Sequence, residues 1–127
     1  MAMHFVHVRN LNRPSQPPIL ARWCSSFLCR LRGLTFRRSL ADDEGLLLVQ
    51  RRENRSDAAI HMLFVWIDLA VIWINSTHEV VDVQLARRWR PFYMPKAPAQ
   101  YVLEISSARL SEFQAGDCLS FEEFQVD

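Results

Sequence analysis

The side chains of this sequence that could do chemistry begin with His61 and Asp68, which interrupt the most apolar run of the chain, residues 59–75. A histidine can act as a general base, and a carboxylate can orient it when the two groups approach to about 3 Å. We predict that residues 60–65 and 68–74 pair as a hairpin. At about 3.3 Å per residue, the two side chains then share a face but lie roughly 13 Å apart. We therefore expect no catalytic dyad and assign no catalytic residue.

Both residues also have a structural interpretation, which we favour. Asp68 starts a strand, where a carboxylate can accept backbone N–H groups of the preceding turn. His61 on an apolar strand can be a core histidine that is satisfied by one backbone carbonyl. His61 nevertheless remains the best single candidate for a functional site.

A second group of candidates lies in "RRWRPFY", where Arg87, Arg88 and Arg90 flank Trp89. Cations mixed with aromatic rings occur at nucleic-acid and phosphate sites. The alternative is a loop that closes one end of the fold, with Trp89 buried and the arginines paired to acidic residues. Arg37 could join such a patch, although a solvated charge run is favoured. The candidate ligand-binding residues are thus His61, Asp68, Trp89, Arg90 and Arg37.

The composition excludes several kinds of site. Only three glycines are present, each more than ten residues from the next, which excludes a P-loop, a dinucleotide turn and a nucleophile elbow. Cys24, Cys29 and Cys118 are an odd number without paired-ligand spacing, so we expect neither a disulfide framework nor a zinc site. We expect all three to be small core residues in a reducing compartment. No metal and no cofactor are predicted.

The apolar run is not expected to cross a membrane. Its 17 residues, 58–74, fall short of a span, and Asp68 near the middle would cost about 3 kcal/mol on insertion scales. The N-terminus has no apolar segment of the length of a signal peptide, so a cytoplasmic location is expected. Residues 1–55 hold ten arginines and four acidic residues, whereas the remainder is acidic. This asymmetry indicates either an anionic partner or, as we favour, two chain ends that pack side by side.

The elements that must position these residues are mostly short strands, because apolar residues alternate along the chain. The clearest is 79–86, with Val81, Val83 and Leu85 facing in and Asp82 and Gln84 facing out. A short helix is expected within 25–34, with serine caps and Gly33 near its end. Further strands are predicted at 4–9, 19–23, 45–50, 101–106 and around Leu119 and Phe121, with loops at 51–56 and 87–98 and a helical turn at 107–113.

These elements predict a mainly β fold of about seven short strands with one or two short helices. The arrangement would be a β-sandwich, jelly-roll-like, or a partly closed barrel. The length of 127 residues suits a single domain, 1–127. Within it, residues 1–18 are expected to form an N-terminal strand and loop extension.

Six segments in this order resemble the prokaryotic family called domain of unknown function 192: "RLRGLTFR", "EGLLLV", "AIHMLFV", "DLAVIWI", "VVDV" and "APAQYVLEI", the last followed by "AGDCLSF". The similarity covers about residues 20–123. It implies a jelly-roll β-sandwich and no established activity. The chain departs from the family pattern in turns: Trp66 replaces a common proline, "NSTH" replaces an Asp-Gly turn, and Ala108 replaces a glycine.

We expect a small soluble domain that is more a binding module than an enzyme, with an unknown small ligand or protein as partner and no membrane. One alternative is a hydrolase that uses His61 as general base. Another is a module that binds RNA or phosphate through the RRWR loop, so a nucleic acid is an open but less favoured partner.

Overall fold

Alternating apolar residues bring the two ends of the chain together in the computed structural model, which describes residues 4–124. β1 (Phe5–Asn10) lies between β2 (Ile19–Cys24) and β7 (Leu119–Phe124) and runs antiparallel to both. The N-terminal strand is thus an inner strand of the sheet. Its basic residues meet acidic residues of the C-terminal half, since Arg9 approaches Glu122 at 3.5 Å and Arg13 approaches Asp117 at 3.6 Å. The side-by-side packing of the two chain ends is confirmed, and within the described residues it pairs two of the ten arginines of residues 1–55, Arg9 and Arg13, with acidic residues of the second half.

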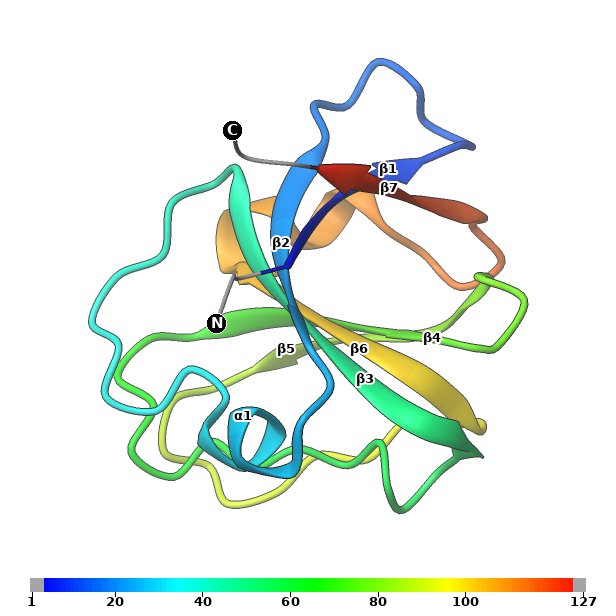
Figure 1. The fold of residues 1–127 in the computed structure, drawn as a ribbon. Helices are drawn as coiled ribbons and strands as arrows, with labels where there is room; N and C mark the ends of the chain where they lie inside the picture. Colours follow the sequence, from blue (N-terminus) through cyan, green and yellow to red (C-terminus); the bar gives the residue numbers. More distant parts are fainter. Residues whose placement is uncertain (1–3, 125–127) are drawn as a thin grey trace.

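The remaining strands complete one curved sheet. They are β3 (Glu44–Asn54), β4 (Leu69–Ile74), β5 (Val80–Ala86) and β6 (Ala99–Ser106), and the order is β5-β4-β6-β3-β2-β1-β7. β2 and β3 are parallel, and every other neighbouring pair is antiparallel. The sheet twists until its two edges approach each other (Figure 1), and Glu79 beside β5 pairs with Cys118 beside β7. The prediction of a mainly β, partly closed architecture is confirmed.

β4 is buried on both faces, which explains why its sequence is continuously apolar. Ala70, Ile72 and Ile74 point into the cluster that fills the inside of the curved sheet, together with residues of β1, β2, β3 and β6. Leu69, Val71 and Trp73 point to the opposite face and form a second cluster there. The sheet therefore needs a cover on its outer face.

Residues 58–65, here called the cover segment, supply part of that cover. Ala58, Ile60 and Met62 are buried against the outer face. The Trp73 indole N–H donates to the Ala58 carbonyl at 2.8 Å. The predicted hairpin of 60–65 with 68–74 is wrong, because both edges of β4 are already taken by β5 and β6. The alternation of buried and less buried side chains in 58–62 arises because this segment packs on the face of the sheet, and not because it is a strand of the sheet.

Two short helices connect the strands. α1 (Phe27–Arg32) begins after Ser26, whose side chain accepts from the Cys29 N–H, and ends at Gly33, which has a φ of 50°. The 3-10 helix η1 (Ser107–Glu112) follows β6. Both helical predictions are confirmed, including the serine cap and Gly33 at the end of α1.

A disulfide joins Cys24, the last residue of β2, to Cys29 in α1. The prediction of free cysteines was wrong here, because a strand end followed by a helical turn brings the two Cα atoms to 5.6 Å, within bonding geometry. Cys118 is free and exposed, and so it is not the small core residue that we expected. The disulfide also removes one argument for a reducing compartment.

Two further corrections concern strands. β3 continues to Asn54, through most of the predicted 51–56 loop. Asp82 is buried and not outward-facing, because its carboxylate accepts from the Val83 N–H, the Gln84 amide and the Lys96 N–H. Among the described residues, no helix is long and apolar enough to cross a membrane.

Candidate functional site

A cleft of about 690 Å³ lies between α1 and the outer face of the sheet. Its walls come from α1 and the turn after it, from the middle of β3 and from the cover segment. Apolar side chains make up much of the lining: Phe27, Leu31, Leu34, Leu48, Ile60 and Val65. The cleft is therefore built where the second hydrophobic cluster opens toward solvent.

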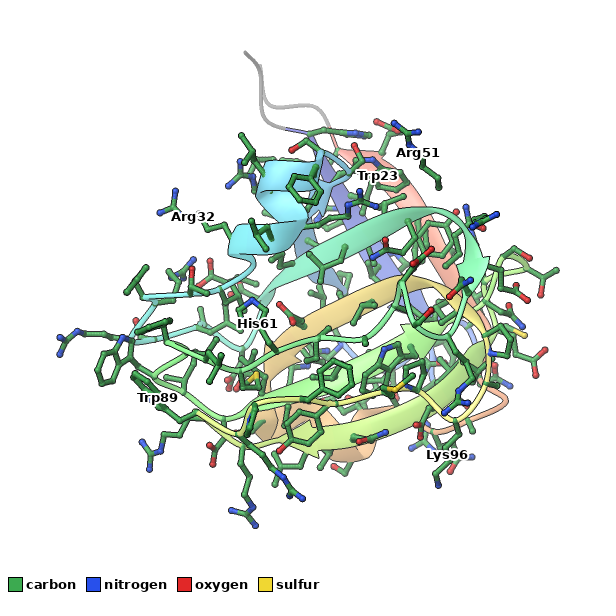
Figure 2. The ribbon with its side chains drawn as sticks, turned by 90° about the horizontal axis from the view of Figure 1, so that it is seen from below. Trp23, Arg32, Arg51, His61, Trp89 and Lys96 are labelled. Carbon is green, nitrogen blue, oxygen red and sulfur yellow. A yellow bond between two sulfur atoms is a disulfide. The ribbon has the colours of Figure 1, made fainter. Side chains whose placement is uncertain are left out.

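His61 enters this cleft because of its place in the cover segment. Its neighbours Ile60 and Met62 are buried against the sheet, so the imidazole between them is directed away from it, and in Figure 2 it lies between α1 and the strands. Nε2 lies 3.4 Å from the Leu31 carbonyl oxygen. A carbonyl only accepts, so Nε2 is the donor in this contact. Nδ1 is buried, and no described residue hydrogen-bonds to it.

Glu104 of β6 lies on the floor of the same cleft and is only 4% exposed. Its Oε1 is buried without a hydrogen-bond partner among the described residues. A methyl group added to Gly33 would lie 3.8 Å from this oxygen, which places the carboxyl group beside the end of α1. Burial raises the pKa of Glu104 to about 7. Below that pH the group is a neutral acid and can donate a hydrogen bond.

Sequence reasoning missed Glu104. The available signal was a carboxylic acid inside "YVLEIS", a strand in which Val102, Leu103 and Ile105 are buried. A glutamate is seldom fully buried without a partner, so this position indicated a site. The alternating pattern did not reveal Glu104 as a site residue, because the acid occupies a position at which a half-buried strand is expected to have an outward, solvent-exposed side chain.

The rim of the cleft is cationic. Arg30, Arg32, Arg51 and Arg52 line it, against the single exposed acid Asp57. The Arg30 guanidinium is held by the Gln50 side chain at 2.8 Å. Figure 2 shows Arg32 and Arg51 on opposite sides of α1. A concave site with an excess of one charge attracts ions of the opposite sign, here anions.

The other predicted site residues lie outside this cleft. Asp68 Oδ1 accepts the Arg88 backbone N–H at 2.8 Å; this donor lies in the loop after β5 and not in the preceding turn, where the prediction placed it. Trp89 is 41% exposed and projects from the periphery in Figure 2, so it is not the buried residue of the alternative interpretation. Arg90 lies over the Tyr93 ring, and Arg37 pairs with Glu44 at 3.0 Å. Of the predicted site residues, His61 alone therefore lines the cleft, although the Trp89 N–H of the arginine loop donates to the carbonyl of the adjacent Met62.

The cleft can offer three kinds of contact to a ligand. Glu104 offers a donor while it is protonated, His61 Nδ1 offers an acceptor while the ring is neutral, and the arginines offer positive charge. Within residues 4–124, no group of three or more histidine, cysteine or acidic side chains is placed to hold a metal ion.

The sequence from the last residue of β1 to the middle of β7 matches a known family model. The family is described as "Uncharacterized ACR" and called domain of unknown function 192, and the match covers residues 10–121. The chain belongs to this family. The resemblance drawn from the sequence motifs is therefore confirmed.

Curated members of the family are UPF0127 proteins. The chain is 39% identical over 98 residues to one from Thermococcus kodakarensis, which covers 76% of this chain and 60% of that protein. It is 37% identical over 95 residues to one from Pyrococcus furiosus, covering 75% and 78% of the two chains. The chain spans about 60% of the length of its Thermococcus kodakarensis relative.

Two solved structures share the fold. A "putative transcription regulator" of Sinorhizobium meliloti superposes with a TM-score of 0.82 at 19% identity, over 94% of each chain. A protein of unknown function from Novosphingobium aromaticivorans gives 0.76 at 22% identity, over 93% of this chain and 84% of that one. At these identities the likeness concerns the fold alone.

Proposed function

We propose that this protein is a binding module that holds a small organic anion in the cleft between α1 and the sheet. The observation that carries the proposal is the lining of the cleft, in which His61 Nδ1 and Glu104 Oε1 are both buried without partners among the described residues. A buried polar atom that lacks a hydrogen bond costs about 1–3 kcal/mol. A ligand that supplied both bonds would recover that cost.

The chemistry of the ligand follows from the lining. The apolar walls suit a hydrocarbon or aromatic body, the arginine rim suits a carboxylate or phosphate, and the floor suits a group that both donates and accepts. The volume of about 690 Å³ lies within the range of sites for small molecules, about 300–1,000 Å³. A macromolecule would not reach Glu104 under Gly33. A cytoplasmic location stays a prediction.

Thermal unfolding in the presence of simple probes tests the proposal. Benzoate and phenyl phosphate combine an apolar ring with a negative charge, and benzamide is an uncharged comparison. A ligand that binds only the folded chain raises the midpoint of unfolding with its concentration. We expect both anions to stabilise the wild type more than benzamide does, and more at pH 6 than at pH 8, because Glu104 donates only while protonated.

Variants of the floor and a matched control complete the test. His61→Ala should reduce the stabilisation at both pH values. Glu104→Gln, whose amide donates at any pH, should keep at pH 8 the stabilisation that the wild type shows at pH 6, and so remove the difference between pH 6 and pH 8. His7→Ala is the control, because that ring packs on Phe124 outside the cleft. Equal stabilisation of all four proteins, or none by any anion, would contradict the proposal.

The same two groups favour a second candidate function, general acid and base catalysis. A carboxylic acid whose pKa is raised to about 7 is suited to donate a proton near neutral pH, and His61 could accept one. If the wild type hydrolysed phenyl phosphate during the same incubation and Glu104→Gln did not, the result would favour catalysis over ligand binding as the function of the cleft.

A further inference from the structure

A second surface, separate from the cleft, carries four exposed aromatic rings. We call Phe36, Phe64, Trp66 and Trp89 the aromatic patch; their exposed fractions are 66%, 48%, 40% and 41%. The rings form one continuous cluster, with centroid separations of 5.6 Å between the phenylalanines, 5.2 Å between Phe64 and Trp89, and 5.1 Å between the tryptophans. None of the four lines the cleft.

The backbone holds these rings outward at an energetic cost. Phe36, Phe64 and Trp89 have φ values of 66°, 62° and 65°, in the left-handed region that bulky residues rarely adopt. Two hydrogen bonds fix the loops to each other, from the Phe36 N–H to the Phe64 carbonyl at 2.7 Å and from the Trp89 N–H to the Met62 carbonyl at 3.0 Å. Strain of this kind persists where the surrounding structure enforces it, often at ligand-binding positions.

Arginines lie beside the rings. The Arg38 guanidinium lies over the Trp66 ring, 5.5 Å from its centroid. Arg87, Arg88 and Arg90 are exposed and flank Trp89 in the chain. Within residues 4–124, Arg88 is the one of these four that approaches a carboxylate, that of Asp68, and at 4.0 Å this ion pair is weak. The patch thus presents flat rings and positive charges side by side.

We propose that the aromatic patch binds single-stranded nucleic acid, with bases stacked on the rings and phosphates paired with the arginines. A nucleic acid strand alternates a flat base with an anionic phosphate, and the patch offers partners for both, in its cluster of rings and in Arg38 and the exposed arginines next to Trp89 in the chain. An anionic membrane fits less well, because Arg38 lies on the face of Trp66 and would enter the apolar layer with it. Stacking accepts any base, so little sequence preference is expected.

Fluorescence anisotropy of a labelled oligo(U) of about 12 nucleotides, a length within the usual range for such sites, tests the proposal on the whole chain. We expect Trp89→Gly to weaken binding about 10-fold by loss of one stacking ring. Glycine is chosen because it relieves the positive φ of 65°, so the variant should fold. Arg38→Gln should reduce the slope of log affinity against log salt by about 0.7, the value for one phosphate contact.

Phe124→Ala is the matched control, because this ring is 37% exposed but packs on His7 in the β1–β7 region. It should bind as the wild type does. Three results would overturn the proposal: no binding at 50 mM salt, equal binding of polyphosphate of the same charge, or affinity unchanged in Trp89→Gly. Binding to phosphatidylglycerol vesicles without binding to oligo(U) would also overturn it and assign the patch to a membrane.

Discussion

Glu104 is a buried carboxylic acid in the proposed ligand site, and its burial has a cost in stability. Its carboxyl group lies in a low-dielectric floor without a counter-ion, and so the folded chain holds its proton more tightly than the unfolded chain does. Between the ordinary glutamate pKa of 4.5 and the raised pKa of about 7, the folded state therefore binds more protons than the unfolded state. Its contribution to the free energy of unfolding falls as pH rises through this window.

The first prediction follows for Glu104→Gln, which keeps the shape and removes the titration. From pH 4.5 to pH 8, the stability of the variant relative to the wild type should rise by roughly 3 kcal/mol. Urea unfolding at several pH values measures both curves. Parallel curves for the two proteins would show that Glu104 does not titrate in this window.

At this scale the sequence indicated His61 and not Glu104. His61 was visible because it interrupts a run of apolar residues. Glu104, which lines the same cleft, was not visible in the sequence, because a single acidic residue at an outward position of an alternating strand is typical of a solvent-exposed side chain. Glu104 is buried because Gly33, at the end of α1, packs close to its carboxyl group. No local pattern in the sequence around Glu104 predicts this long-range contact. The roles of Asp68, Trp89, Arg90 and Arg37 in binding stay predictions.

Among the elements, the cover segment depends on one anchor in β4. Trp73 is fully buried and donates to the Ala58 carbonyl. We predict that Trp73→Phe lowers the free energy of unfolding by about 3 kcal/mol, through the lost hydrogen bond, the unpaired carbonyl and the cavity. Amide exchange in 58–65 should quicken as well. Trp66→Phe, at an exposed ring, should change stability by less than about 0.5 kcal/mol.

α1 depends on its disulfide, since none of its six residues is buried. For a loop of this length, replacing both cysteines, Cys24→Ser with Cys29→Ser, should cost about 2 kcal/mol on the chain-entropy estimate. Amide exchange should rise in α1 while the sheet stays protected. Cys118→Ser serves as the comparison, because that thiol is free and exposed. Unchanged exchange in α1 would show that the helix is held by other contacts.

The strands were predictable and the cover segment was not. Alternation located β1, β2 and β6 within one or two residues and identified β7 by Leu119 and Phe121, because each has one face on a core. Periodicity cannot distinguish a strand from an extended segment that lies across a sheet, since both bury every second side chain. The central hairpin failed for this reason.

For the molecule as a whole, the seam between the two sheet edges is held by buried polar groups. Asp117 is 3% exposed and accepts from the Asn10 side chain at 2.8 Å and from the Gln114 N–H at 3.0 Å. Its backbone carbonyl accepts from Val80 at the start of β5. This residue therefore connects β1, the turn before β7 and the opposite edge of the sheet.

We predict that Asp117→Ala lowers the free energy of unfolding by about 2–3 kcal/mol, because it removes the buried acceptor of both the Asn10 amide and the Gln114 N–H and leaves Asn10 with the Glu112 carbonyl alone. Glu122→Ala removes a surface pair with Arg9 and should cost less than about 1 kcal/mol. Chemical denaturation of both variants compares them directly. A similar small loss in the two would mean that the seam does not depend on Asp117.

The parallel pairing of β2 with β3 has a consequence for how related chains can diverge. Parallel neighbours cannot be joined by a tight turn, so the chain must travel a long way between them, and that excursion contains α1. One wall of the cleft is thus formed by the connection between β2 and β3. The strand order requires this connection, but the pairing of the strands does not determine its amino-acid sequence. Substitutions in this connection would change the ligand preference of the proposed site, while the backbone pairing of β2 with β3 would stay in register.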